Sequence, residues 1–525
     1  MTAAPRIDVW VKWTAIAAVV VGVALRLHRA AVIALSFDEC MQLLPVHSNS
    51  FAEAYEHFAE FAHPPLFLML TYPLGALTLT ELGARIVPLL SSILLPVVLY
   101  IWLRDRAGLI AACTAVTIIS LSSNWITLTP QVRSYSLAFL FFVLSLMWLD
   151  QAIDRDQLIR LGLAGSALIL AILSDYSLAI VCPAITLYGF ARLHEVRARR
   201  PLWLAWALAI VLAMFTFGML YWFQIRLYVV FAADFSTSWL RQGFRVPGES
   251  LAHFLIWSTY KQFAYLSSRQ LTGVLFALPF LLSLPFVSVA WRVLLVMPFA
   301  TGLTLCLLRL FAFGQTRHSA IVSLLIAVGV GLAAQRWLAT RPRAWLAVGP
   351  ALVACCYFTA SPHPMDWPDD QLDPHAFRAA AEFAGSLPTA GAAVLTTGHT
   401  RDVLQYYRLI QGAPLLNLAT HVYGELKSEY LIVEIAAIRA NARLRPSDPV
   451  FVVDAGNYPF KYPPSQPSGP IRKFGPMRFW RLEGTGSLPA TPLLPRPLRR
   501  LRVDQSRTPN FRKIAIIGHQ FVNAD

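Results

Sequence analysis

Two adjacent carboxylates, Asp38 and Glu39, follow the first long apolar run of the chain, in the segment SFDEC at 36–40. Two adjacent carboxylates at the water-facing end of a membrane helix suggest a reaction site at the membrane surface. A carboxylate there can take the proton of an attacking hydroxyl group, so Asp38 is the candidate base. Glu39 could share that proton, orient an acceptor or help to hold a divalent cation. The alternative for both is helix capping or hydration at the membrane exit.

Further polar motifs interrupt or flank the apolar runs. They are HPPL at 63–66, ARIVP at 84–88, QVRSY at 131–135, SDY at 174–176 and QTRH at 315–318. Arg133 and Arg317 carry forked guanidinium groups that suit the leaving phosphate of a lipid carrier. Their alternative is to reach from a helix end to lipid headgroups. Arg85 begins the second apolar run, where phosphate binding and anchoring in the interface fit equally.

The remaining candidates are substrate-binding residues. His63 precedes two prolines and could contact sugar, phosphate or a metal ion, or be incidental to a stiff loop. Asp175 borders either a cavity or the water line. Tyr135 and His318 accompany the two arginines. Lys261 and Arg269 lie in or beside 251–266, whose spacing and aromatic residues favour an amphipathic helix in the interface, with the carrier's entry route as the second interpretation.

The elements that must position these residues are membrane helices. Of 525 residues, 56% are hydrophobic and 14% charged, and the mean hydropathy is +0.54. This length accommodates roughly ten spans of about 20 apolar residues and one further domain. We expect a mainly α, polytopic bundle of about 11 spans, with a small C-terminal α/β domain. The expected spans are 12–33, 84–103, 108–127, 134–150, 160–177, 178–193, 202–223, 271–290, 293–313, 318–335 and 343–360.

The net charge of +15 indicates orientation, because Lys and Arg concentrate in short cytoplasmic loops. With a cytoplasmic N-terminus, the basic loops at 104–106, 154–160, 192–200, 291–292 and 335–343 all fall inside. Every polar motif then lies on the opposite side of the membrane. Because these motifs share one side, we expect them to form a functional site. The soluble segments contain no basic motif with interleaved aromatic residues, so nucleic-acid binding is not expected. We expect a multi-pass protein of a bacterial inner membrane, with its site on the periplasmic side.

The chain changes character after about residue 360. Four prolines between 362 and 374 break the apolar pattern, and charged residues become regular. Helical spacing at 376–386 and 428–442 and short apolar runs at 392–396 and 450–454 predict an α/β domain. The expected organisation is therefore a membrane module at 1–360, with a catalytic outer loop at 34–83, and a periplasmic domain at 361–525 that ends in a basic tail.

On these motifs, the chain resembles the GT-C-type membrane glycosyltransferases related to protein O-mannosyltransferases and lipid A aminoarabinose transferases. The order and common sidedness of FDE (37–39), HPPL, ARIVP, RSY (133–135) and RH (317–318) carry the resemblance, which covers essentially all of 10–360. It implies a transferase that moves a hexose or pentose from an undecaprenyl-phosphate type of carrier to an acceptor hydroxyl. Cys40-Met41-Gln42 departs from the extended first-loop motif of members with protein acceptors, so lipid, glycan and protein acceptors stay open.

Two other classes of function remain. A transporter or flippase could use buried charges along a substrate pathway, but such proteins commonly show repeats and broken helices that meet at the membrane midplane. No repeat is evident here. A polymerase of lipid-linked glycans would share the arginines without needing Asp38 as its indispensable base. The expected partners are the lipid-linked sugar donor, an acceptor and membrane lipids. No cofactor is expected except a divalent cation, which Asp38, Glu39 and His63 could hold.

Overall fold

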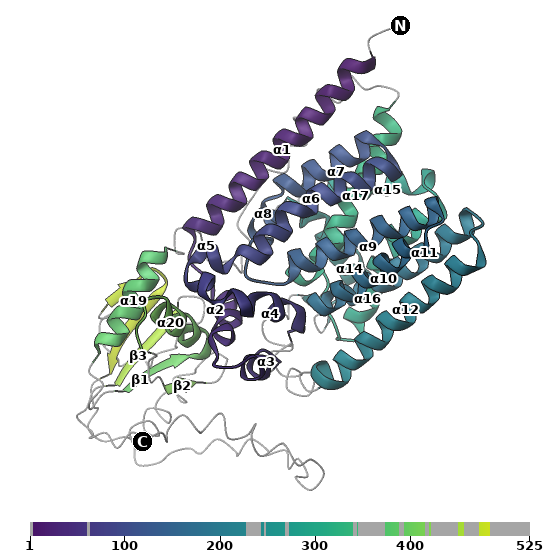
Figure 1. Ribbon diagram of the computed structural model, residues 1–525. Helices are drawn as coiled ribbons and strands as arrows, with labels where there is room; N and C mark the ends of the chain where they lie inside the picture. The colour runs from purple at the N-terminus through teal and green to yellow at the C-terminus, as the bar shows by residue number, and fades with distance from the viewer. Residues whose placement is uncertain are drawn as a thin grey trace. The chain divides into compact units, whose positions relative to one another are not determined.

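The computed structural model describes residues 4–59, 63–226, 243–245, 248–267, 272–314, 316–339, 344, 373–387, 393–414, 419–421, 450–455 and 472–482. The chain divides into two compact units, Met1–Pro374 and His375–Asp525. We describe each unit by itself. Figure 1 shows the helices of the first unit and the sheet with its helices in the second.

Membrane helices dominate the first unit. Within the described residues, six helices are long and apolar enough to cross a membrane. They are α1 (Ala4–Val32), α6 (Ile86–Ala107), α9 (Tyr135–Arg155), α12 (Arg200–Leu220), α16 (Val289–Leu307) and α17 (Ala320–Leu338). Shorter helices lie between them: α7 (Leu109–Leu121), α8 (Ser123–Leu128), α10 (Leu158–Ser174), α11 (Cys182–Glu195), α14 (Leu251–Ala264) and α15 (Gly273–Ser283).

Each predicted apolar span up to residue 335 overlaps one of these helices. The span expected at 108–127 is the exception, because the chain breaks at Ser122 into α7 and α8. Ser122 leaves helical geometry (φ −58°, ψ 124°), and its hydroxyl donates a hydrogen bond to the Leu266 carbonyl at 2.6 Å. Apolar periodicity does not reveal such a break. The expected span at 343–360 lies outside the described residues, apart from residue 344.

The core of the first unit is built around α7, which is buried along almost its whole length. It packs against α1, α6 and α17, while α9 packs against α6 and α10 (Figure 1). Two glycines allow neighbouring helices to approach the backbone of α7 closely. A Cβ atom at Gly22 of α1 would lie 2.4 Å from the Ser120 carbonyl oxygen, and one at Gly331 of α17 would lie 2.6 Å from that of Ala111. Larger residues there would push these helices apart.

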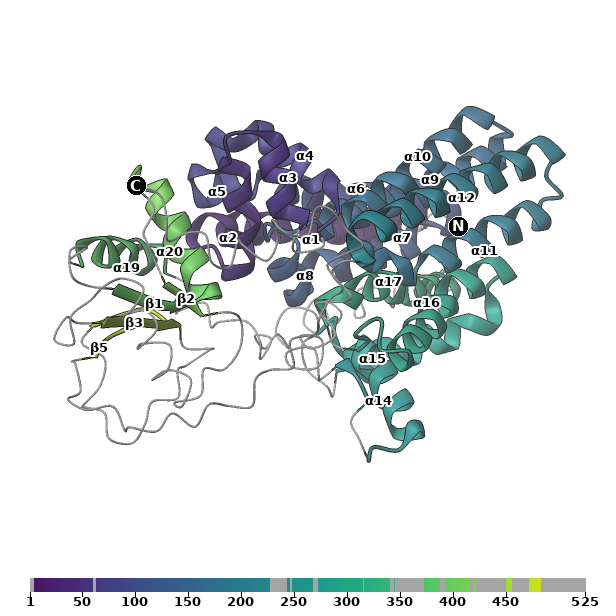
Figure 2. The ribbon, with the colours of Figure 1, turned by 90° about the horizontal axis from the view of Figure 1, so that it is seen from below.

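The connection between α1 and α6 folds into a group of short helices. These are α2 (Phe37–Leu43), η1 (Leu44–His47), α3 (Phe51–Ala59), α4 (Pro65–Thr71), η2 (Tyr72–Leu79) and α5 (Glu81–Ala84). Both views show α2, α3, α4 and α5 close together (Figures 1 and 2). The sequence prediction treated this connection as a loop and missed the apolar segment Pro65–Leu79.

The second unit contains a five-stranded sheet in the order β2-β1-β3-β5-β4. Its elements are α19 (Pro374–Ser386), β1 (Ala393–Thr397), α20 (Gly398–Ile410), β2 (Ala419–His421), β3 (Val450–Ala455), β4 (Arg472–Phe474) and β5 (Met477–Leu482). Strand β1 pairs in parallel with β2 and β3, whereas β5 is antiparallel to β3 and β4. Helices α19 and α20 lie over one face (Figure 2).

Three elements of this α/β unit were predicted: α19, β1 and β3. The strands β2, β4 and β5 and the helix α20 were not predicted, because short strands and a helix rich in polar residues leave a weak apolar pattern. The helix predicted at 428–442 and the basic tail beyond 492 lie outside the described residues.

Candidate active site

Glu39 is a buried anchor of the first connection. Arg85 donates two hydrogen bonds to its carboxylate, from Nε at 2.8 Å and from Nη2 at 2.9 Å. The backbone N–H groups of Ser36 and Val132 donate to the same carboxylate at 2.8 and 2.9 Å. Glu39 thereby caps α2 and connects it to the segment that precedes α9. Burial alone would raise the pKa of Glu39, but Arg85 and these N–H groups lower it.

Asp38 lies between Arg133 and Arg317, two of the three arginines that the sequence singled out for phosphate binding. Its Oδ1 atom is 2.8 Å from Nη2 of Arg133, and its Oδ2 atom forms an ion pair with Arg317. Arg133 precedes α9 and Arg317 precedes α17, so residues far apart in sequence converge on α2. Burial alone would raise the pKa of Asp38, but the two guanidinium groups lower it well below the usual range of an aspartate.

Gln42 completes the support of Arg133. In the amide orientation that pairs both of its polar atoms, it accepts a hydrogen bond from Arg133 Nη1 at 2.7 Å and donates to the Val132 carbonyl at 3.0 Å. Asp38 and Gln42 are one helical turn apart on α2, so one short helix presents both acceptors to one guanidinium group. The sequence analysis did not single out Gln42, although its spacing of four residues from Asp38 was a usable signal.

His63 and His318 lie close to the charges of Asp38, Arg133 and Arg317. The His63 ring packs on Phe58 with 5.2 Å between ring centres, and the His318 ring meets Tyr135 edge to face at 6.2 Å. Burial, reinforced by the positive charge of Arg133, lowers the pKa of His63 to about 3. His63 is therefore neutral at physiological pH and offers a polar, uncharged surface beside Asp38.

The lowered pKa of His63 predicts a pH dependence of stability. Below an unfolded-state pKa of about 6.5, the unfolded chain gains a proton that the folded protein does not take up until about pH 3. Stability should therefore fall on acidification through this window, by at most about 1.4 kcal/mol per pH unit from this group. His63→Gln should make the fall less steep in thermal unfolding between pH 7 and 4.5. His57→Gln, at an exposed position of α3, is the control, and parallel profiles for His63→Gln and wild type would contradict the prediction.

Asp175 is a second buried carboxylate, placed in the break between α10 and α11. Its Oδ1 atom accepts a hydrogen bond from the Ser177 N–H at 2.7 Å, and its Oδ2 atom lies 3.4 Å from the Ser134 hydroxyl, next to Arg133. Burial raises the pKa of Asp175, and its partners and the charge of Arg133 offset this only in part. The two carboxylates, Asp38 and Asp175, thus have environments that shift their pKa values in opposite directions.

Not every predicted residue faces this group. Arg85 is 4% exposed, and besides Glu39 its guanidinium group donates to the carbonyls of Ala30, Ile33 and Ala34 at 2.6–3.1 Å. Lys261 lies on α14 over the Trp257 ring, 5.9 Å from its centre. Its side chain is also near Gly314, three residues before Arg317. Arg269 lies outside the described residues.

The sequence predicts that Asp38, Glu39 and His63 could hold a divalent cation. Among the described residues, no three His, Cys, Asp or Glu side chains are grouped so that they could hold a metal ion. The carboxylates of Asp38 and Glu39 face guanidinium groups, which oppose a second positive charge at the same oxygens. This arrangement of the pair therefore does not fit a divalent cation.

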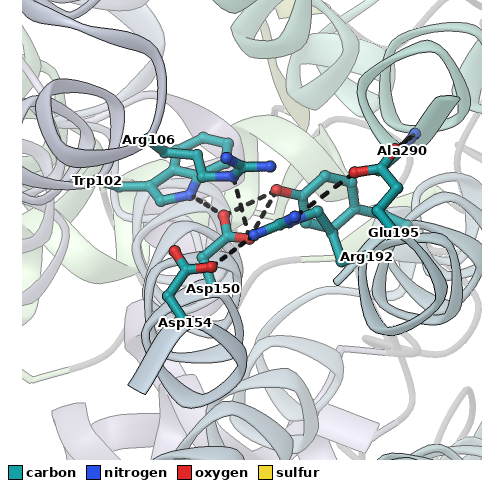
Figure 3. Close-up of polar contacts among 8 residues, drawn as sticks. Trp102, Arg106, Asp150, Asp154, Arg192, Glu195 and Ala290 are labelled. Carbon is teal, nitrogen blue, oxygen red and sulfur yellow. Dashed lines mark hydrogen bonds and ion pairs between the residues drawn. The ribbon is translucent and has the colours of Figure 1, made fainter. Parts of the chain in front are cut away.

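A second buried polar group, missed by the sequence analysis, surrounds Asp150 (Figure 3). Its carboxylate accepts hydrogen bonds from Trp102 at 2.8 Å, from the Tyr188 hydroxyl at 2.7 and 2.9 Å, and from Arg192 at 3.0 Å. Arg106 lies 3.5 Å away. Asp150 is 15 residues, or about 22 Å along α9, from Tyr135. A carboxylate at the end of an apolar run was the available signal.

No protein-family model matches the chain, and no curated protein matches its sequence. Solved structures do resemble it. ArnT from Cupriavidus metallidurans bound to undecaprenyl phosphate has a TM-score of 0.55 at 13% identity, over 89% of this chain and 97% of ArnT. The apo form scores 0.53 with the same identity and coverage. An oligosaccharyltransferase from Archaeoglobus fulgidus scores 0.46 at 12% identity, over 85% of this chain and 69% of that one.

The likeness to ArnT covers nearly the whole length of both chains, and it agrees with the long apolar helices followed by a separate α/β unit. The expected fold class is confirmed: the chain has the polytopic GT-C fold of ArnT.

Proposed function

We propose that the chain is a membrane glycosyltransferase that moves a sugar from a polyprenyl-phosphate carrier to an acceptor hydroxyl. One observation carries the proposal: Asp38 lies between two guanidinium groups that converge from separate parts of the bundle. Paired arginines bind a phosphate through parallel N–H donors. In support, a protein with the same fold, ArnT, has been solved with undecaprenyl phosphate.

The donor phosphate and Asp38 compete for the same guanidinium groups. While both arginines pair with Asp38, its low pKa makes it a weak base. A carrier phosphate bound to Arg133 and Arg317 weakens these ion pairs and brings a further negative charge, which raises the proton affinity of the carboxylate. Donor binding thereby converts Asp38 from a counter-ion into a base.

The reaction then proceeds by displacement at the anomeric carbon. The acceptor oxygen forms a bond to this carbon while its proton passes to Asp38. The bond from the carbon to the phosphate oxygen breaks, and its electron pair leaves with the carrier phosphate, whose growing charge is stabilised by Arg133 and Arg317. Glu39 and Arg85 hold α2 in place, whereas His63, His318 and Tyr135 line the approach to the sugar.

The orientation expected from the basic loops is part of the proposal. It places α2 and the arginines at the periplasmic face of a bacterial inner membrane, where a lipid-linked donor and an envelope acceptor meet. The acceptor can be lipid, glycan or protein, and the sugar a hexose or a pentose. The second unit is proposed as the periplasmic part that selects the acceptor.

The proposal is tested with the full chain in bilayers. Undecaprenyl phosphates carrying labelled mannose, glucose, galactose or arabinose are supplied with extracted envelope material, and release of the carrier and transfer of the sugar are measured. The expected result is turnover of one sugar class. Carrier binding without any transfer would favour a flippase or a polymerase that uses a lipid-linked glycan, and no binding of any carrier would favour a transporter of another substrate.

A further inference from the structure

Arg26 is a charged residue inside the first membrane helix, less than two turns before the helix ends at Val32, and the mechanism above does not use it. The residue is 2% exposed. Nη1 and Nη2 donate to the carbonyls of Ser120 and Ile119 at 3.0 and 2.9 Å, and Nε donates to the Thr129 hydroxyl at 3.0 Å. Among the described residues, no carboxylate pairs with Arg26.

The location of these acceptors explains how a buried cation is tolerated there. Ile119 and Ser120 belong to the last turn of α7, whose terminal carbonyls lack partners within the helix and carry partial negative charge. Gly22 brings α1 close enough for the contact, since a Cβ atom there would lie 2.4 Å from the Ser120 oxygen. The Gly22 carbonyl itself accepts from Arg26 Nη1 at 3.0 Å. Arg26 thus caps α7 from a neighbouring helix.

The third acceptor connects Arg26 to the candidate active site. Thr129 follows the last residue of α8, and four residues later the chain reaches Arg133. Between them, the Val132 N–H donates to Glu39 at 2.9 Å. Glu39 is held by Arg85, which in turn donates to three carbonyls at the end of α1. These contacts begin at Arg26 of α1 and return to the end of α1 through Arg85. They include Val132 and Glu39, the chain neighbours of Arg133 and Asp38.

The same short helix also reaches the second arginine. Trp125 of α8 is fully buried, and its indole N–H donates to the Ser323 hydroxyl of α17 at 2.9 Å. The turn immediately before α17 carries Arg317. A shift of α8 would therefore move both guanidinium groups relative to α2.

We propose that Arg26 is a positioning residue, which fixes α8 and so holds Arg133 and Arg317 at the spacing that a carrier phosphate requires. The inference rests on the proposed function, because it assigns that phosphate to these two arginines. Lysine keeps the charge of Arg26 but cannot reach three acceptors through a planar fork, so it should not restore the spacing.

The test compares Arg26→Lys, Thr129→Val and Arg133→Lys, together with the double variant that combines both lysines. Binding of sugar-free undecaprenyl phosphate in bilayers and the unfolding temperature without ligand are both measured. Thr14→Val is the matched control, because its hydroxyl bonds within the exposed part of α1. We expect Arg26→Lys to weaken carrier binding about tenfold, Thr129→Val to act in the same direction, and Thr14→Val to have no effect.

The double variant separates positioning from general stabilisation. If Arg26 acts through Arg133, the double variant should bind the carrier no more than about threefold more weakly than Arg133→Lys alone. The inference would be overturned if the loss of carrier binding in the double variant equalled the product of the losses in the two single variants. Normal carrier binding by Arg26→Lys would also overturn it. A wild type that does not bind the carrier would refute the proposed function instead. Whether Arg26 positions Arg133 is then decided by the unfolding temperatures: losses smaller than the sum of the single variants support this role, and additive losses overturn it.

Discussion

Asp38→Asn is expected to reduce sugar transfer by about 10²–10⁴-fold while carrier phosphate binds as tightly as in the wild type or more tightly. The amide cannot take the acceptor's proton, and loss of a positioned base typically costs 10²–10⁴-fold. The neutral side chain also no longer competes with the phosphate for Arg133 and Arg317. Measurements of kcat, KM and carrier affinity in bilayers should therefore show a large fall in kcat with a carrier affinity that is unchanged or higher.

The matched control is Asp105→Asn, which removes an exposed carboxylate paired with Arg104 and should leave transfer unchanged. Full turnover by Asp38→Asn would show that the base lies elsewhere. Asp175 would then be the next candidate, because it is buried, lies beside Arg133 and has a raised pKa. Loss of carrier binding together with transfer would instead assign Asp38 to shaping the phosphate site.

Asp150→Asn is expected to lower the free energy of unfolding by about 3–5 kcal/mol, the range for breaking a buried ion pair from one side. The substitution preserves shape but leaves Arg192, which is almost fully buried, without its one buried carboxylate partner, since Asp154 and Glu195 are more exposed. It also removes an acceptor from Trp102 or Tyr188 (Figure 3). Asp150 lies near the end of α9, whereas Arg133, the partner of Asp38, lies just before the helix begins. The kcat of the folded fraction should therefore be unchanged. Chemical or thermal unfolding in detergent measures the loss.

Asp154→Asn provides the comparison within the same group. Its carboxylate contacts the same guanidinium group at 2.7 Å but is 49% exposed, so its loss should cost no more than about 1 kcal/mol. Equal losses for the two variants would contradict the assignment of the stabilising role to the buried carboxylate. A fall in kcat for folded Asp150→Asn would indicate that the two polar groups are coupled along α9.

The sequence by itself determined the class of the protein and the residue types of the site. Long apolar runs have few alternatives to membrane helices, because an unpaired backbone is too costly in lipid. Charged residues that interrupt such runs are conspicuous, so Asp38, Arg133 and Arg317 could all be identified from their surroundings. The ion pairs between them were not predicted, and these pairs hold the pKa of Asp38 well below its usual range.

The tertiary structure alone decided which acceptor each arginine meets. Arg26, Arg85 and Arg133 are all arginines at or inside apolar runs, and periodicity gives no reason to distinguish them. In the folded chain, Arg26 caps α7, Arg85 holds Glu39 and the end of α1, and Arg133 faces Asp38. The difference arises from helices distant in sequence, whose close approach depends on packing at glycines such as Gly22. Local sequence sets where a charge enters the membrane, whereas packing between helices sets the partner that balances it.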